Sequence, residues 1–330
     1  MAIRMGLLGA GRIGKVHAGA IAAIPDARLV AVADAMPEAA ASLAASTGAE
    51  VRAADAIINA KDIDAVLITT PTDLHATMIE QSAKAGKAIF CEKPIDLDVA
   101  RVEACLAVVA KEKAALMVGF NRRFDPNFME ARRRIDQGDI GTVEIVAITS
   151  RDPGPPPGDY IKRSGGMFRD MTIHDFDMAR FLLGEEPVSA FAVGSNLVDP
   201  AIGRLGDIDS AAIILTTATG KIAQINNSRR ATYGYDQRIE VHGSKGMVSA
   251  ENIRETTVEV ATVAGYTRDP LQNFFMTRYT QAYRNEIAAF VAAIKSGAAM
   301  APSGHDGLVA LKIAEAALRS SKEGKAVAIA

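Results

Sequence analysis

The glycine spacing near the N-terminus constrains this chain more than any other feature. An apolar run at 3–8 leads into Gly9-x-Gly11-x-x-Gly14, and a helical pattern follows. Twenty residues after Gly14, a second apolar run ends at Asp34. Strand, glycine turn, helix, strand and acid is the order of a dinucleotide-binding βαβ unit. The sequence therefore predicts that a Rossmann domain begins almost at the first residue.

The residues of the glycine turn have separate predicted roles. Gly9 permits the tight turn, Gly11 lets the backbone approach a pyrophosphate, and Gly14 lets the helix pack against the strand. The first helical turn, which includes Arg12 and Ile13, offers unpaired N–H groups to the phosphates. The alternative is a glycine-rich turn that binds nothing, but both flanking elements and the acid are present. We therefore expect a bound dinucleotide.

Asp34 predicts which dinucleotide this is. Its carboxylate is suited to accept hydrogen bonds from ribose hydroxyls and to repel a 2′-phosphate. Alanine, not arginine, follows at position 35. The sequence therefore favours NAD over NADP.

Composition and charge exclude several kinds of partner. The chain has 330 residues, 49% of them hydrophobic, and a net charge of -2, which allows two domains with real cores. It has no long basic run, no signal sequence and no apolar stretch long enough to span a bilayer, so we expect neither a nucleic-acid nor a membrane partner. Cys91 and Cys105 cannot form a disulfide scaffold, and the histidines lack zinc-ligand spacing. These features indicate a cytoplasmic protein without a metal.

Two successive patterns divide the chain. Apolar runs alternate with alanine-rich helical segments up to residue 120, which predicts a doubly wound parallel sheet. The predicted strands are 3–8, 29–33, 65–69, 88–90 and 116–119, and the predicted helices are 15–23, 37–46, 74–85 and 98–111. After a helix at 126–137, strand-like runs follow one another through short turns, which predicts a large, mainly antiparallel sheet. Residues 151–160 are too rich in Pro and Gly for regular structure, and helices at 277–295 and 305–321 close the chain.

We therefore predict an α/β Rossmann domain at 1–120. Residues 121–330 form an α+β domain for substrate binding and oligomerisation, and the last helix is free to return to the first domain. A broad sheet with one free face otherwise exposes apolar surface, so we expect a homodimer or homotetramer assembled through this sheet.

Chemistry in open α/β folds lies beyond the carboxyl ends of the strands. Thr70 follows the third predicted strand, His75 comes one helical turn later, and Glu92-Lys93-Pro94 follows the next strand. We expect Thr70, His75, Glu92 and Lys93 to contact the cofactor. A lysine here can orient a hydroxyl or carbonyl, and its positive charge lowers the pKa of an alcohol. The alternative is an exposed lysine beside a turn, but the position at the cofactor edge favours a functional role.

A second polar cluster follows Gly165-Gly166. If Asp170 opens a helix, His174 lies four residues on, on the same helix face. Histidine suits a general base that removes a hydroxyl proton while hydride leaves the same carbon, and a neighbouring carboxylate would orient it. An N-capping Asp and a half-buried core His explain the spacing equally well.

Four motifs together resemble one known family. GAGRIGKVHA, TTPTDLHA, CEKP and GGMFRDMTIHDFD, in that order, are similar to the glucose-fructose oxidoreductase and inositol dehydrogenase family, and the resemblance covers essentially the whole chain. It implies that Lys93, Asp170 and His174 are catalytic. His174 would act as base, Asp170 would tune it, and Lys93 would orient the reacting hydroxyl near the nicotinamide.

Three further segments are most similar to the myo-inositol 2-dehydrogenases of that family, namely GFNRRFD, SRDPGPPP and YGYDQR. This resemblance implies NAD-dependent, metal-independent oxidation of a ring hydroxyl on a cyclic polyol, with myo-inositol and 2-keto-myo-inositol as the expected substrate and product. It places Asn121, Asp152 and Tyr233 in the substrate shell, with Asp175 as a further candidate. Asp152 as a turn cap and Tyr233 as sheet packing are the alternatives. Many relatives have Asn where Thr72 stands, which weakens any detailed cofactor contact at that position.

Two other functions stay open. A sister enzyme with the same three catalytic residues would act on scyllo- or D-chiro-inositol or on a pyranose sugar. A non-catalytic member would bind NAD or a sugar as a sensor, but a sensor has no need of Lys93, Asp170 and His174 together.

Overall fold

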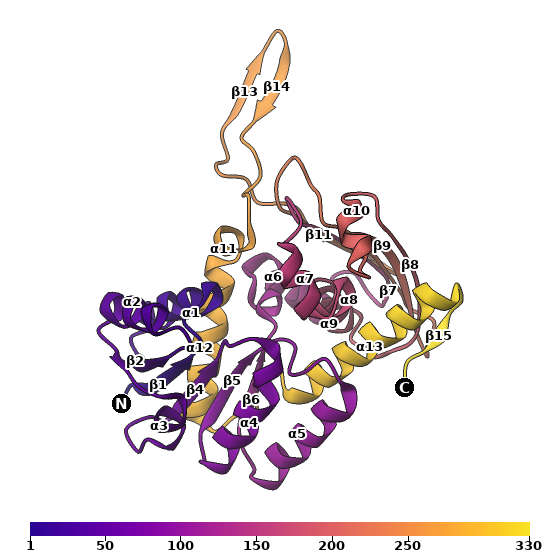
Figure 1. The fold of residues 1–330 in the computed structure, drawn as a ribbon. Coiled ribbons are helices and arrows are strands. Elements are labelled where there is room, and N and C mark those ends of the chain that lie inside the picture. The colour runs from indigo at the N-terminus through magenta and orange to yellow at the C-terminus, as the bar shows by residue number, and fades with distance from the viewer. The chain divides into compact units, whose positions relative to one another are not determined.

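The chain forms two compact units in a computed structural model that describes residues 1–330. Unit 1 consists of Met1–Phe124 and Thr280–Leu311, and unit 2 of Asp125–Tyr279 and Lys312–Ala330. The sequence-based boundary lies at residue 120, whereas this division also assigns 121–124 and 280–311 to unit 1. Indigo to magenta and yellow-orange segments thus belong together in unit 1 (Figure 1).

Unit 1 contains a six-stranded parallel sheet in the order β3-β2-β1-β4-β5-β6. The strands are β1 (Ile3–Leu8), β2 (Ala27–Ala33), β3 (Glu50–Val51), β4 (Ala65–Ile68), β5 (Ala88–Glu92) and β6 (Leu116–Gly119). Every residue of β4 and β6 is buried, which explains why these strands read as continuous apolar runs rather than as alternating ones. The predicted doubly wound Rossmann fold is confirmed.

Helices cover this sheet. They are α1 (Arg12–Ala22), α2 (Pro37–Thr47), α3 (Ala54–Asn59), α4 (His75–Lys84), α5 (Val99–Lys111) and α12 (Thr280–Ser296), with short 3₁₀ turns η1 (Thr72–Leu74) and η2 (Asn121–Phe124). Helix α12, from late in the chain, packs against α1, while α4 packs against α5. Local signals set the helix ends: Pro37 opens α2, Gly48 ends it with a φ of 72°, and the Asp98 carboxylate caps α5 by accepting from the Ala100 N–H.

Unit 2 contains a seven-stranded sheet in the order β12-β11-β7-β10-β9-β8-β15. The strands are β7 (Val143–Arg151), β8 (Pro187–Ser195), β9 (Ser210–Thr217), β10 (Ile222–Ser228), β11 (Asp236–Gly243), β12 (Gly246–Ala250) and β15 (Val327–Ala328). Only β7 and β10 pair in parallel, so the predicted mainly antiparallel sheet is confirmed.

Unit 2 has six helices of its own, and of these α6 and α9 contact the sheet. They are α6 (Pro126–Asp136), α7 (Gly158–Ser164), α8 (Met167–Asp170), α9 (Ile173–Leu183), α10 (Pro200–Arg204) and α11 (Phe275–Arg278), and α13 (Gly304–Glu323) begins in unit 1 and ends in unit 2. Helix α9 contacts β7 and β10 and is buried at nine of its eleven positions, so it forms the centre of the unit 2 core. No helix of the chain has both the length and the apolar character that crossing a bilayer requires.

The prediction that 151–160 lacks regular structure is wrong at both ends. Strand β7 continues through Arg151, and α7 begins at Gly158. Pro157 has extended backbone angles immediately before the helix, where its missing N–H costs nothing. Only the middle of the segment is irregular.

A hairpin of β13 (Glu259–Thr262) and β14 (Gly265–Arg268) lies apart from the large sheet of unit 2 (Figure 1). Both strands are exposed along their whole length. The hairpin therefore contributes nothing to the core of unit 2.

Candidate active site

The glycine turn of unit 1 leaves room for a ligand at one position and none at the others. A Cβ atom on Gly9, whose φ is +105°, would lie 2.6 Å from the Thr69 carbonyl, and one on Gly14 would lie 2.0 Å from the Gly9 oxygen. A Cβ on Gly11 would meet nothing within 4 Å. Gly9 and Gly14 thus serve close packing, while the open space at Gly11 leaves the start of α1, with Arg12 and Ile13, accessible to phosphates.

Asp34 lies directly after β2 with its carboxylate already oriented. Its Oδ2 accepts a hydrogen bond from the Ala10 N–H at 2.6 Å, and its Oδ1 accepts one from the Met36 N–H at 2.8 Å. A carboxylate offers about four acceptor positions, so about two remain for hydroxyl groups. Together with the space at Gly11, this arrangement fits the ribose and pyrophosphate of a dinucleotide.

The remaining predicted residues of unit 1 lie at the carboxyl edge of three neighbouring strands. Thr70 follows β4, Glu92 is the last residue of β5, Lys93 comes next, and Asn121 opens η2 after β6. Lys93 and Thr70 are half-buried, whereas Glu92 and Asn121 are 9% and 3% exposed. The sheet thus brings these side chains to the edge where α/β folds bind ligands.

His75 is buried at the start of α4 between two main-chain carbonyls. Its Nδ1 lies 2.8 Å from the Pro94 oxygen and its Nε2 lies 2.7 Å from the Thr70 oxygen. Burial lowers the pKa of His75 below its usual value of 6.5, although the hydrogen bonds to these two carbonyls partly oppose this shift. His75 therefore links the segments that follow β4 and β5.

Sequence reasoning missed His17, which is fully buried in α1. Its Nε2 lies 2.6 Å from Oε1 of Glu92. The ring meets Phe90 and Tyr283 edge-on, with centroids 5.0 and 5.5 Å away. The sequence carried one weak signal, since His17 follows Gly14 by three residues in the GAGRIGKVHA motif.

Glu286 on α12 is fully buried, and neither of its carboxyl oxygens has a protein hydrogen-bond partner. Burial and the nearby charge of Glu92 raise the pKa of Glu286 well above its usual value of 4.5. His17, His75 and Cys91 are the other titratable groups that Glu92 contacts or acts on by its charge. Because the folded pKa is raised, the contribution of this group to stability is present below about pH 4.5 and is lost as the pH rises towards the folded pKa.

We expect Glu286→Met to raise the melting temperature, and to raise it more at pH 8 than at pH 5. Methionine fills similar space without ionising, and an unsatisfied buried polar group costs about 1–3 kcal/mol. Thermal unfolding between pH 5 and 8 measures the effect, with Glu112→Met on the exposed end of α5 as the control. An equal gain at both pH values would contradict the ionisation argument.

The acid and histidine of unit 2 do not share one helix, contrary to our expectation. Asp170 ends α8, and His174 is the second residue of α9, with Met171 and Thr172 between the two helices. The Thr172 hydroxyl donates to Asn227 at 2.7 Å, a contact with β10 that local spacing does not reveal. The expectation that Asp170 opens a helix was therefore wrong.

Two residues that the sequence did not reveal hold Asp170. The Tyr160 hydroxyl donates to Asp170 Oδ1 at 2.7 Å, and the Arg229 guanidinium lies 3.8 Å from Asp170 Oδ2. Arg229 is 1% exposed and also pairs with Asp207 at 3.5 Å. The only sequence signals were a tyrosine in the Pro-Gly segment and the basic pair of the NNSRR run.

The other predicted substrate residues of unit 2 differ in exposure. Asp175 is fully buried and accepts a hydrogen bond from Asn227 at 2.8 Å, while Asp152 is half-buried after β7. Tyr233 is 49% exposed and donates to Asp236 at 2.6 Å, and burial together with this bond raises the pKa of Tyr233. The buried Asp175 thus fits a supporting role, whereas the phenol of Tyr233 is accessible from solvent.

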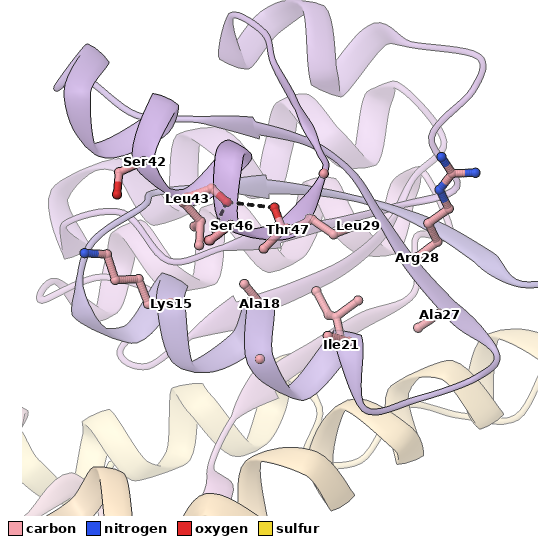
Figure 2. Close-up of a pocket in the computed structure, with 13 residues that line it drawn as sticks. Lys15, Ala18, Ile21, Ala27, Arg28, Leu29, Ser42, Leu43, Ser46 and Thr47 are labelled. Atoms are coloured by element: carbon pink, nitrogen blue, oxygen red, sulfur yellow. Dashed lines mark hydrogen bonds between the residues drawn. The ribbon is translucent and has the colours of Figure 1, made fainter.

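None of the predicted site residues lines a surface hollow of about 670 Å³ in unit 1 (Figure 2). It lies between α1, α2 and β2 and is lined mostly by small and apolar residues such as Ala18, Ile21 and Leu43. Lys15 and Arg28 lie toward its rim, and no acid or histidine lines it.

Comparison with known families decides the identity of both units. Residues 3–120 match the profile described as an oxidoreductase family with an NAD-binding Rossmann fold, and residues 128–249 match the GFO/IDH/MocA C-terminal domain. The chain belongs to the GFO/IDH/MocA oxidoreductase family. As a member of this family it is an oxidoreductase, and its Rossmann unit is NAD-binding.

Relatives within the GFO/IDH/MocA family match the chain along its whole length. An inositol 2-dehydrogenase of Rhizobium meliloti (strain 1021) is 68% identical over 330 residues, 100% of each chain. A crystal structure of a protein assigned as a myo-inositol dehydrogenase, from Sinorhizobium meliloti 1021, has a TM-score of 0.98 at 67% identity and also covers 100% of each chain. A scyllo-inositol dehydrogenase from Lactobacillus casei with bound NAD(H) and scyllo-inositol has a TM-score of 0.93 at 32% identity, covering 100% of this chain and 99% of the other.

Proposed function

We propose that this protein is an NAD-dependent inositol 2-dehydrogenase that oxidises myo-inositol to 2-keto-myo-inositol. One observation carries the proposal: 68% identity, without a gap in coverage, to an inositol 2-dehydrogenase. The geometry at Gly11 and Asp34 supports NAD as the cofactor.

The proposed roles follow from the chemistry of the residues. When bound, NAD accepts the hydride from the carbon that carries the reacting hydroxyl. Lys93 orients that hydroxyl and lowers its pKa by its positive charge. His174 removes the hydroxyl proton as general base. The hydrogen bond from Tyr160 and the charge of Arg229 hold the Asp170 carboxylate, to which we assign the role of orienting this histidine.

The substrate contacts belong to the same proposal. Asn121, Asp152 and Tyr233 present amide, carboxylate and phenol groups, which suit a ring with a hydroxyl on every carbon. The hydrogen bond between Asn227 and Asp175 supports a positioning role for Asp175. Thr70, His75 and Glu92 complete the proposed surroundings of the cofactor.

A panel of polyols tests this function. The purified protein is assayed with NAD and NADP on myo-, scyllo- and D-chiro-inositol and on glucose, by the absorbance of the reduced cofactor. We expect the highest kcat/KM with NAD and myo-inositol. Preference for scyllo-inositol would favour the sister activity, which the likeness to the Lactobacillus casei enzyme makes the next candidate. NAD binding without turnover on any of these compounds would favour a sensor.

We also propose a homodimer or homotetramer formed through the large sheet of unit 2. Helix α9 packs on one face of this sheet, and the other face exposes apolar side chains. They are Ile145, Phe191, Val193, Ile214 and Met247, each at least 37% exposed, with Phe191 opposite Ile214 in the β8–β9 register.

We expect Ile214→Glu to lower the oligomeric state, because a charge buried in an apolar interface is costly. Size-exclusion chromatography with light scattering measures the mass, and Val51→Glu on β3 of unit 1 is the control. A wild-type protein that is monomeric at micromolar concentration would contradict the proposal.

We place the protein in the cytoplasm. Both cysteines, Cys91 and Cys105, are buried free thiols, as suits a reducing compartment. Fractionation of the native host with an activity assay tests this placement.

A further inference from the structure

The segment that carries Lys93 is held on both sides by buried histidines. The residue before it, Glu92, has its carboxylate 2.6 Å from Nε2 of His17. The residue after it, Pro94, has its carbonyl 2.8 Å from Nδ1 of His75. The two histidines come from different helices, α1 and α4, and are 0% and 2% exposed.

Each histidine is itself fixed. The ring of His17 lies edge-on to Phe90 and Tyr283, so two aromatic side chains set its orientation. Nε2 of His75 makes a second contact, 2.7 Å to the Thr70 oxygen. A carbonyl oxygen only accepts, so a ring protonated on both nitrogens bonds both carbonyls, whereas a neutral ring bonds one of them.

The carboxylate of Glu92 is also confined from the next strand. A Cβ atom on Gly119 of β6 would lie 3.2 Å from the carboxylate oxygens of Glu92, which is close contact. Glu92 therefore packs against a bare backbone on one side and bonds His17 through Oε1. Little freedom remains for the main chain at the lysine.

We propose that His17 and His75 are positioning residues that fix the main chain on either side of Lys93. This inference rests on the proposed function, in which Lys93 orients the reacting hydroxyl. Because His17 lies on the helix that begins at the glycine turn, it also ties the phosphate-binding helix to the lysine segment. Displacing a catalytic group by about 1 Å costs roughly 10²-fold in rate. The pair of histidine contacts on either side of Lys93, here called the clamp, therefore affects turnover more than cofactor affinity.

The two histidines of the clamp differ in the number of ring nitrogens that make contacts. The contact of His17 uses Nε2 alone, and a glutamine amide reaches about the same place, so His17→Gln should keep the bond that His17→Phe removes. Both ring nitrogens of His75 face a carbonyl oxygen, and an amide side chain has only one nitrogen, so neither His75→Gln nor His75→Asn can reproduce both contacts.

The test measures kcat and KM for myo-inositol and the Kd of NAD by calorimetry on the full chain. We expect His17→Phe and both His75 variants to lower kcat by about 10-fold or more, and His17→Phe to leave the NAD Kd within about 3-fold. We expect His17→Gln to keep kcat near that of the wild type. The control is His305→Gln, an exposed histidine at the start of α13.

Lys93→Met distinguishes the proposed role of the lysine from the proposed positioning role of the two histidines. Loss of turnover in Lys93→Met with unchanged kcat in the histidine variants would overturn the clamp alone. Parallel losses of NAD affinity and kcat in His17→Phe would also overturn it, because they indicate a general structural role. Full turnover in Lys93→Met would overturn the proposed role of the lysine, and the clamp with it.

Discussion

Replacing His174 with alanine is expected to lower kcat for polyol oxidation by about 10²- to 10⁴-fold, the usual contribution of a general base. Alanine cannot accept the hydroxyl proton, so the barrier rises while the nicotinamide site of unit 1 is untouched. Steady-state kinetics and the NAD Kd measure the two effects separately.

The matched control for this substitution is His305→Ala, which removes an exposed histidine far along the chain. It should change neither kcat nor NAD affinity. Turnover of His174→Ala at the level of this control would remove His174 from the mechanism and leave Asp170 with nothing to orient.

The double change Asp34→Ser with Ala35→Arg is expected to exchange the cofactor preference from NAD to NADP. Hydrogen bonds to charged groups contribute about 1.5–3 kcal/mol, so losing one from a ribose hydroxyl costs roughly 10- to 10²-fold in kcat/KM with NAD. The introduced guanidinium matches a 2′-phosphate, and the repulsion by the carboxylate is gone.

Ratios of kcat/KM for the two cofactors, measured on the same preparations, decide this prediction. Asp34→Asn is an informative companion, because it removes the charge and keeps one acceptor oxygen for the Ala10 or Met36 N–H. If the wild-type protein already prefers NADP, our interpretation of Asp34 is wrong.

Burial decides how well the sequence predicted the strands. The predicted bounds of β1 and β6 agree with the structure because each is a compact apolar run. Strand β8 was not predicted, since Ala, Ser and Gly dilute its apolar pattern. The two-residue strand β3 is too short and exposed to carry a pattern.

For the site, the sequence predicted single residues but not the side chains that pair with them. Motif spacing was enough to nominate Lys93, Asp170 and His174, because these residues lie within short signatures. The bond between His17 and Glu92 joins residues 75 positions apart, and Arg229, directly after β10, reaches Asp170 at the end of α8. Such partners are defined by the fold, so no local pattern in one sequence contains them.

Helix α12 belongs to unit 1 but comes late in the chain, which affects how the protein folds during synthesis. The ribosome releases every strand of the parallel sheet early, but the helix that packs against α1 emerges only after all of 125–279. Until then, the side of α1 and Phe90 that Tyr283 and Phe290 later cover stays open to water or to chaperones. Unit 1 is therefore complete only once 280–311 has emerged, and unit 2 only once 312–330 has followed. Both units finish folding late in synthesis, whereas domains usually fold one after another from the N-terminus.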